Sequence, residues 1–262
     1  MALGCGVRVF LWWCWAWVAD YSDLLQGLVY SGAAITLGSV VMLKPWQAVG
    51  PARLFGTVDL LLQTLPQKSS TVVLLHGVRF AANLGASMRA MHLLGGDAII
   101  CVGEAFKIPL HSGVKPMVPP LLHDALRMSM ALRHNWPVCL AALPPPDAVQ
   151  AVRSCAAAGL RPVCVETDII GQRNPPTALE HADLASHGCG GGVLFVLGAE
   201  DVGVPDDVVA ACEDFISIRT ARRGSLNVSH VVSLVLHERL RQMRAGISTS
   251  EGKSVGKVSV AA

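Results

Sequence analysis

The stretch of sequence that decides the fold covers residues 193–243 and reads VLFVLGAEDVGVPDDVVAACEDFISIRTARRGSLNVSHVVSLVLHERLRQM. Its first part, residues 193–197, is an apolar run preceded and followed by glycines, which predicts a buried strand. A polar loop over residues 198–205 comes next. A short helix is expected after it, because Pro205 suits a helix start and the acidic residues 206–207 place negative charge where the helix dipole favours it.

A second apolar run, residues 215–218, predicts another buried strand. A loop over residues 219–224 follows it, and Ser225 is a candidate N-cap for a long helix that ends near Met243. Two polar loops therefore leave the ends of two apolar strands. Because ligands bind at that position in open α/β sheets, the two loops together predict a binding site.

The chain upstream alternates apolar strands with helices, which predicts a parallel sheet covered by helices on both faces. No G-x-G-x-x-G pattern follows the first strand, which argues against an ordinary dinucleotide-binding fold. The expected strands are residues 71–75, 98–102, 137–143 and 162–166, and the expected helices are residues 83–94, 121–134, 147–158 and 177–186.

A polar motif opens the first of these helices, where Asn83, Gly85 and Arg89 are spaced as N-x-G-x-x-x-R. Taken alone, the motif is explained by Asn83 capping the helix and by Arg89 lying in solvent. Its position after a strand, upstream of two further polar loops that follow strands, favours a shared functional site instead.

The three motifs resemble those of the SpoU/TrmH family of RNA 2′-O-ribose methyltransferases, within the SPOUT superfamily. Gly198, Glu200 and Gly203 match the family pattern G-x-E-x-x-G, and residues 225–229 match S-L-N-V-S without a gap. The chain departs from the family at Arg219, where relatives have proline. It departs again at residues 79–82, where relatives place an Asp-Pro turn.

The resemblance implies an α/β knot, in which the segment with the second and third motifs threads through a loop to make a deep trefoil. Such knots are rare enough that patterning alone does not predict one. The implied organisation is a hydrophobic N-terminal extension over residues 1–70, a methyltransferase domain over residues 71–243 and a disordered tail over residues 244–262.

The activity implied by the resemblance is transfer of a methyl group from S-adenosylmethionine to a ribose 2′-hydroxyl of RNA, with tRNA favoured over rRNA. The implied catalytic residues are Arg89, Asn83, Glu200, Ser225 and Asn227. The implied cofactor-binding residues are Leu197, Gly198, Gly203, Ile218 and Leu226, with residues 166–167 as weaker candidates. The candidate RNA-binding residues are Arg89, Arg222 and Arg223, followed by Arg239, Arg241 and Arg244, although an ordinary solvated charged face explains them equally well.

Arg89 is a poor base, because a guanidinium stays protonated in proteins. The expected role is a clamp that binds the substrate phosphate and polarises the hydroxyl. Relatives are homodimers in which each active site draws on both chains, and the residues expected to suit such an interface are Val231, Val232, Leu234 and Val235. One rival interpretation is an RNA-binding or scaffold protein that keeps the fold with weak or no catalysis.

The composition excludes a disordered chain and favours a large core or membrane contact, since 52% of residues are hydrophobic and 15% are charged. The net charge is only +2. Any RNA contact must therefore come from a local patch or a dimer. None of the eight cysteines forms C-x-x-C or pairs with histidines at zinc spacing, so no metal site is expected. Several cysteines lie in apolar runs, which predicts reduced thiols in a reducing intracellular compartment, the cytoplasm or the mitochondrion.

The N-terminal segment contains two apolar runs, residues 3–19 and residues 24–43. The second is as long as one bilayer crossing, which needs about 20 residues. Three interpretations stay open: a targeting segment, a membrane hairpin that anchors the protein, and a helical extension packed on the domain or at a dimer contact.

Overall fold

The structure, a computed structural model, describes residues 46–49, 51–66, 70–106, 120–166, 176–185, 191–199, 202–222 and 224–252. The chain divides into two units, Met1–Leu43 and Lys44–Ala262, and the described residues all belong to the second. Both N-terminal apolar runs lie outside the described residues. Of the helices that are described, none combines the length and the hydropathy that a membrane crossing requires.

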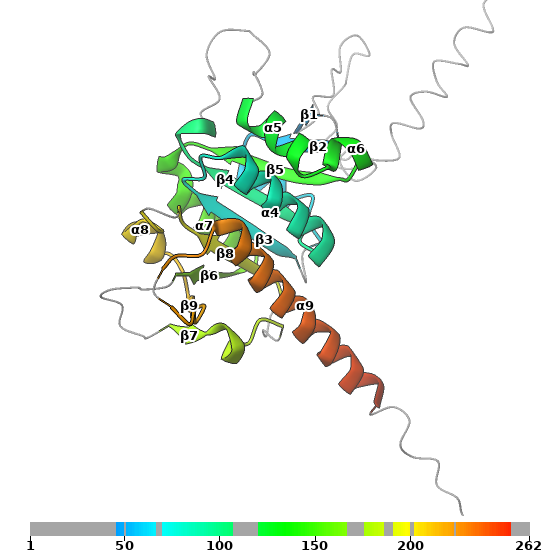
Figure 1. Cartoon of the computed structure of the whole chain (residues 1–262), viewed down its shortest axis with the longest axis vertical. Helices are drawn as coiled ribbons and strands as arrows, with labels where there is room; N and C mark the ends of the chain where they lie inside the picture. The colour runs from blue at the N-terminus through cyan, green and yellow to red at the C-terminus, as the bar shows by residue number, and fades with distance from the viewer. Residues whose placement is uncertain are drawn as a thin grey trace, which may run out of the picture. The chain divides into compact units, whose positions relative to one another are not determined.

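The described residues contain one sheet of nine strands in the order β1-β2-β5-β4-β3-β8-β6-β9-β7. Neighbouring strands are parallel except β1 and β2, which pair antiparallel at one edge. The centre of the sheet is the pair β3 and β8 (Figure 1). The strands are β1 Trp46–Val49, β2 Ala52–Phe55, β3 Thr71–His76, β4 Ala98–Val102, β5 Val138–Leu143, β6 Arg161–Val165, β7 Thr177–Ala178, β8 Val193–Leu197 and β9 Asp214–Ser217.

Helices cover both faces of the sheet, as the alternation predicts. Successive residues of a strand point to opposite faces. Val73 and Leu75 accordingly belong to one core cluster with side chains of α4, α5 and α9, and Val72 and Leu74 belong to a second cluster with side chains of α3, α7 and α8. The helices are α3 Val58–Leu62, α4 Ala81–Leu94, α5 Pro120–Met128, α6 Ala131–His134, α7 Ala148–Ala157, α8 Asp206–Val209 and α9 Val228–Gly252.

The two helices that carry polar motifs begin at other residues than expected. Helix α4 begins at Ala81, so Asn83 lies inside its first turn and is not its N-cap. Helix α9 begins at Val228, and Asn227 caps it: the Asn227 Oδ1 atom accepts from the Ser229 backbone N–H at 2.9 Å. Ser225 is therefore not the cap. Helix α9 also continues to Gly252, past the expected end at Met243 and into the tail that was expected to be disordered.

Three further expectations about secondary structure change. The helix expected over residues 121–134 is broken into α5 and α6 at Met130, whose φ of 70° lies in the left-handed region. The helix expected over residues 177–186 is absent from its described part, which holds strand β7 and a single 3₁₀ turn. Strands β1 and β2 precede residue 71, so the sheet begins upstream of the expected domain start.

The chain leaves the centre of the sheet at the end of β8 and forms α8. It then forms β9, which pairs with β6, and returns as α9 to pack against α4 (Figure 1). This excursion carries the second and third motifs. The trefoil knot that the resemblance implies for it stays a prediction.

Candidate active site

The first and third motifs meet through their asparagines. The Asn227 Nδ2 atom donates to the Asn83 Oδ1 atom at 3.0 Å, across 144 positions of sequence. The capping bond described above fixes the other end of the Asn227 amide, and the Ser229 hydroxyl also donates to Asn227 Oδ1 at 2.6 Å. The pair therefore joins the N-terminal turns of α4 and α9, where two helix dipoles present their positive ends.

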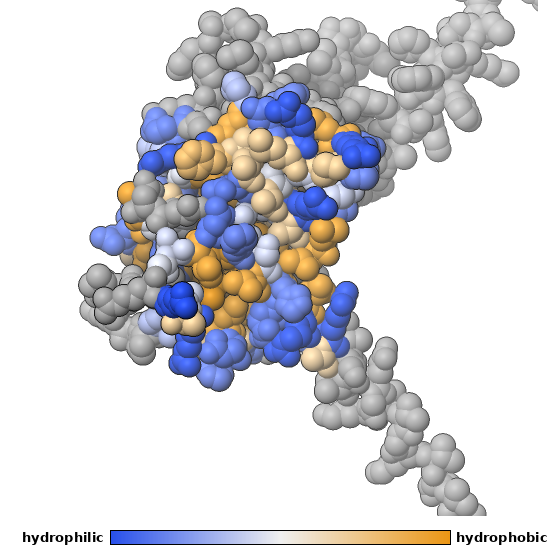
Figure 2. All heavy atoms as spheres, in the orientation of Figure 1, coloured by the Kyte–Doolittle hydropathy of each residue, from blue (hydrophilic) through white to orange (hydrophobic). Residues whose placement is uncertain are grey.

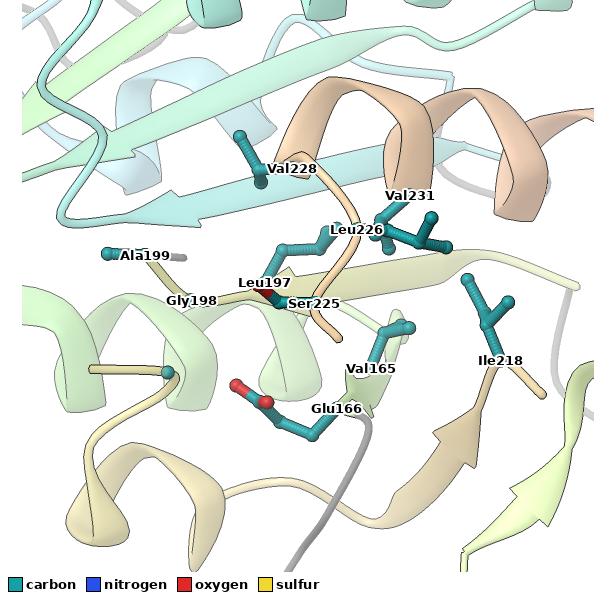
Figure 3. Close-up of a pocket in the computed structure, with 11 residues that line it drawn as sticks. Val165, Glu166, Leu197, Gly198, Ala199, Ile218, Ser225, Leu226, Val228 and Val231 are labelled. Atoms are coloured by element: carbon teal, nitrogen blue, oxygen red, sulfur yellow. The ribbon is translucent and has the colours of Figure 1, made fainter. Parts of the chain in front are cut away.

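A cavity of about 110 Å³ opens beside this pair, at the ends of β6 and β8 (Figure 3). All five predicted cofactor-binding residues line it, and so does Ser225. Most of its walls are apolar or backbone. The lining residues are Val165, Glu166, Leu197, Gly198, Ala199, Gly203, Ile218, Ser225, Leu226, Val228 and Val231.

The loop after β8 turns back on itself, and two glycines allow this. The Gly203 N–H donates to the Ala199 carbonyl oxygen at 2.8 Å. A Cβ atom at position 198 would lie 2.0 Å from the Gly203 carbonyl carbon, which no side chain tolerates. Gly203 itself has φ of +67°, a conformation that favours glycine. The turn therefore brings bare backbone to the wall of the cavity, where it can approach a ligand closely.

Glu166 follows β6 and closes one side of the cavity. Its backbone N–H donates to the Ile216 carbonyl oxygen at 3.1 Å, so the sheet ladder sets its position. Its Oε1 atom accepts from the Val204 N–H at 2.8 Å, so the side chain holds the glycine turn in place. From the sequence, Glu166 is only a weaker candidate for cofactor binding, because it belongs to none of the three motifs. Its neighbour Thr167 lies outside the described residues.

A second cavity, of about 220 Å³, shares Gly198, Ala199 and Val228 with the first. Its polar lining side chains are His76, Arg79 and Asn83. Burial lowers the pKa of His76, an effect that the charge of Asp207 partly offsets, so this imidazole is neutral at neutral pH. The remaining lining residues are Leu75, Gly77, Val78 and Phe80.

The family model for the SpoU rRNA Methylase family matches residues 70–237, well over half of the chain. The chain belongs to this family. The match covers all three motifs and both cavities. No match was found among curated proteins.

Solved structures of SpoU-type methyltransferases share the fold. The AdoMet-bound rRNA methyltransferase from Sinorhizobium meliloti aligns with a TM-score of 0.52 and 24% identity, over 70% of this chain and 60% of that one. The TrmH/SpoU tRNA modifying enzyme from A. aeolicus aligns with a TM-score of 0.52 and 17% identity, over 74% of this chain and 85% of that one. The SpoU methyltransferase AviRb from Streptomyces viridochromogenes, in complex with AdoMet, aligns with a TM-score of 0.50 and 20% identity, over 73% of this chain and 64% of that one. The chain thus spans about three fifths of the length of several such proteins.

S-adenosylmethionine, abbreviated AdoMet, is the cofactor that membership of the SpoU family implies. The first cavity has the features that such a molecule needs. Ile218 and Leu226 offer apolar walls for an adenine ring, the glycine turn offers backbone polar groups, and Glu166 offers a hydrogen-bond acceptor. No cluster of potential metal ligands is found in the described part of the chain.

Arg89 does not join Asn83 in the second cavity, and it is absent from the first. Its side chain is exposed on α4, and it lines neither hollow. Arg89 follows Asn83 by six positions of the α-helix, so the two residues are about 9 Å apart along the helix axis and about 240° apart around it. One chain of this SpoU member therefore brings together Asn83, Asn227, Ser225 and the cofactor candidates, but not the expected catalytic arginine.

Other predicted residues have different outcomes. Glu200 and Arg223 lie outside the described residues, whereas Arg222 is exposed. Arg239 was a candidate for RNA contact, but it is 2% exposed: its Nε atom donates to Thr71 Oγ1 at 2.8 Å, and its Nη1 and Nη2 atoms donate to carbonyl oxygens. Arg241 is exposed and bonds to Glu238.

The four apolar residues expected at a dimer interface differ in how far they are buried. Val232 and Val235 are fully buried in the chain's own core, which overturns that expectation for them. Val231 is partly buried and lines the first cavity. Leu234 is 42% exposed and is the one member of the set that remains on the surface.

Proposed function

We propose that this SpoU family member transfers the methyl group of S-adenosylmethionine to a ribose 2′-hydroxyl of an RNA, with tRNA favoured over rRNA. The observation that carries the proposal is the Asn83–Asn227 hydrogen bond beside a cavity walled by glycine backbone. The bound cofactor supplies an electrophilic methyl group on a sulfonium. The chain supplies position, and good positioning contributes up to about 7–11 kcal/mol to such a reaction.

The second cavity is the proposed place for the target ribose. It adjoins the cofactor cavity at Gly198, Ala199 and Val228, so a group held there lies next to the cofactor site. Asn83 provides amide hydrogen-bonding groups on its wall, and Arg79 provides a cation for the RNA backbone. We place the protein in a reducing intracellular compartment, which suits the five described cysteines, all of them free thiols.

We further propose a homodimer in which Arg89 of the partner subunit completes the site. Arg89 is exposed on α4, and the exposed apolar side chains Leu93 (61%) and Leu234 (42%) lie on the packed helices α4 and α9. Figure 2 shows apolar side chains over this part of the surface, beside the first turns of α9. A second copy that covered this face would remove that apolar surface from water.

The deciding experiment incubates the full chain with unmodified tRNA or rRNA and isotopically labelled S-adenosylmethionine, then digests the RNA to nucleosides for mass spectrometry. Label in 2′-O-methyl nucleosides is the expected result, and label on a base would overturn the proposal. The alternative, a scaffold that keeps the fold without catalysis, is favoured by Arg89 lying outside both cavities of one chain. Titration calorimetry with S-adenosylmethionine separates the two, because a scaffold without a cofactor site gives no binding heat.

A further inference from the structure

Phe80 is an exposed aromatic residue that lines the second cavity. It is 66% exposed, and the polar side chains on the same wall are His76, Arg79 and Asn83. A single apolar side chain on a protein surface is ordinary, so exposure alone identifies no function. The location of this ring is what matters, because it borders the cavity in which we place the target ribose. That step rests on the proposed function.

Phe80 also occupies a position where its side chain costs the fold a hydrogen bond. It is the N-cap residue of α4, with the extended backbone that a cap requires, a φ of −108° and a ψ of 127°. Serine, threonine, asparagine and aspartate are preferred there, because their oxygens accept from an N–H of the first turn. The phenylalanine ring makes no such bond. A position that gives up a cap and exposes a ring beside a candidate site indicates a functional role.

RNA provides a ligand for an exposed flat ring. Every nucleobase has two flat faces, and proteins that bind unpaired RNA stack these faces on aromatic side chains. The target ribose has its base attached, so a ribose held in the second cavity brings that base close to the residues that line it. Arg79, the preceding residue, is exposed on the same wall and suits an RNA phosphate. A ring beside a cation is the arrangement that single-strand binding proteins use.

A contact between subunits is the other explanation for an exposed apolar ring. Leu93, which lies on the proposed dimer surface, belongs to the same helix as the ring. It follows Phe80 by thirteen positions, which is about 20 Å along the helix axis. Phe80 therefore lies at the opposite end of α4 from Leu93, and it shares its cavity with polar side chains. These observations favour RNA over a second copy of the chain.

We propose that Phe80 binds the RNA substrate by stacking on the base of the target nucleotide, and that it thereby presents the attached ribose to the cofactor cavity. Phe80 is thus a substrate-binding residue outside the three motifs. Because a base within a duplex is already stacked on both faces, the target nucleotide must be unpaired. The ring contributes affinity and position but no base identity, since every base has a flat face.

The test measures RNA methylation by the full chain with variants at position 80. Labelled S-adenosylmethionine and unmodified tRNA or rRNA transcripts give kcat and the KM for the RNA. Phe80→Ala is expected to raise this KM by about fivefold to a hundredfold with little change in kcat, the usual effect of losing one stacked base. Phe80→Tyr keeps a flat ring and is expected to resemble the wild type. Phe80→Leu keeps apolar area without the ring and is expected to resemble Phe80→Ala.

A serine at this position separates its effect on the fold from its effect on RNA. Phe80→Ser supplies the missing cap, so it is expected to raise the midpoint of urea unfolding while it raises the KM as alanine does. Its affinity for S-adenosylhomocysteine, measured by titration calorimetry, should not change, because Phe80 does not line the first cavity. Weaker RNA binding in a more stable protein with an intact cofactor site excludes a general loss of structure.

Leu132→Ala is the matched control, because Leu132 is an exposed apolar residue of α6 that lines neither cavity. It is expected to leave the KM unchanged. An unchanged KM in Phe80→Ala, or a wild-type KM in Phe80→Leu, overturns the stacking proposal. A lower molar mass of Phe80→Ala in light scattering overturns it too, because the ring is then a subunit contact. A wild type that methylates neither RNA refutes the proposed function itself, whereas an active wild type with unaffected variants refutes only the role of Phe80.

Discussion

The Asn227 side chain donates to the Asn83 side chain at 3.0 Å, although 144 positions separate the two residues. Asn227 does this while its own oxygen caps α9, so one amide both starts a helix and joins it to the first turn of α4. The two asparagines are therefore unequal: one has a structural role in addition to its place in the site, and the other faces the second cavity.

Replacing each asparagine with alanine should separate these roles. Asn227→Ala removes the cap of α9, so we expect it to lower the free energy of unfolding by about 1 kcal/mol and also to abolish methyl transfer. Asn83→Ala leaves the cap in place, so we expect loss of methyl transfer with a smaller change in stability. Urea denaturation and the labelled-RNA assay measure the two effects. Equal destabilisation by both variants would contradict the assignment of the cap.

A methyl group at position 198 should destroy the proposed cofactor site. In Gly198→Ala the new Cβ atom has no room against the Gly203 backbone, so the glycine turn must move out of the cavity wall. We expect affinity for S-adenosylhomocysteine to fall by at least about tenfold, which corresponds to about 1.4 kcal/mol. Gly56→Ala is the control, because a Cβ atom there meets no other atom within 4 Å. Unchanged affinity in Gly198→Ala would place the ligand elsewhere.

The partner subunit's Arg89 is testable by mixing two inactive variants. Arg89→Ala and Asn83→Ala should each lack activity as homodimers. In a mixed dimer, one site combines an intact Asn83 from one chain with an intact Arg89 from the other, so activity should return. Subunits are exchanged under mild denaturant and assayed with labelled cofactor. Activity no higher than the sum of the two separate variants would show that each site uses a single chain.

Arg239 should be worth far more to stability than its neighbours on α9. Burial lowers its pKa to about 10, so at neutral pH it is a buried cation whose charge the surrounding oxygens stabilise. Arg239→Met leaves those acceptors without a donor, and we expect a loss of about 2–4 kcal/mol in the free energy of unfolding. Arg244→Ala, on an exposed position of the same helix, should stay within about 0.5 kcal/mol of wild type in the same denaturation experiment.

His76 predicts how stability depends on pH. Its pKa lies below the ordinary value of 6.5 in the folded chain, so between those two pKa values the unfolded chain binds more protons than the folded chain. The contribution of neutral His76 to the free energy of unfolding is therefore fully present above pH 6.5, and it is lost as the pH drops toward the folded-state pKa. His76→Gln should flatten this part of a plot of melting temperature against pH. His123→Gln, on the exposed side of α5, is the control and should leave the slope as it is.

The sequence predicts the parallel sheet well because its central strands are continuous apolar runs buried on both faces. Residues 193–197 and the run that begins at Thr71 need no knowledge of their neighbours to be assigned. The predicted helix over residues 177–186 is wrong because Thr177 and Ala178 pair with β9 at the sheet edge, a tertiary contact that local periodicity does not reveal. Strand β2 was missed for the same reason, since it gains its partner β5 from residues more than eighty positions away.

The motifs predict the site residues, whose functional roles stay predictions, and the structure places several of these residues around the first cavity. Gly198, Ile218 and Leu226 are examples. Ser225 was assigned a capping role because a serine before a helix usually caps it, but the helix begins three residues later and Asn227 takes that role. The contact of Glu166 with the glycine turn is not predictable from the sequence, because only the fold brings the two together.

Helix α9 follows all the described strands in the chain, so the ribosome synthesises it after them. A nascent chain that has emerged only as far as β9 already contains every described strand of the sheet, yet it lacks both Asn227 and Arg239. Until residues 227–239 leave the ribosome, the candidate site lacks the Asn83–Asn227 hydrogen bond, and the core side chains that pack against α9 stay open to water. A product that terminates before Asn227 would therefore lack both the Asn83–Asn227 bond and the buried Arg239, however complete its described strands.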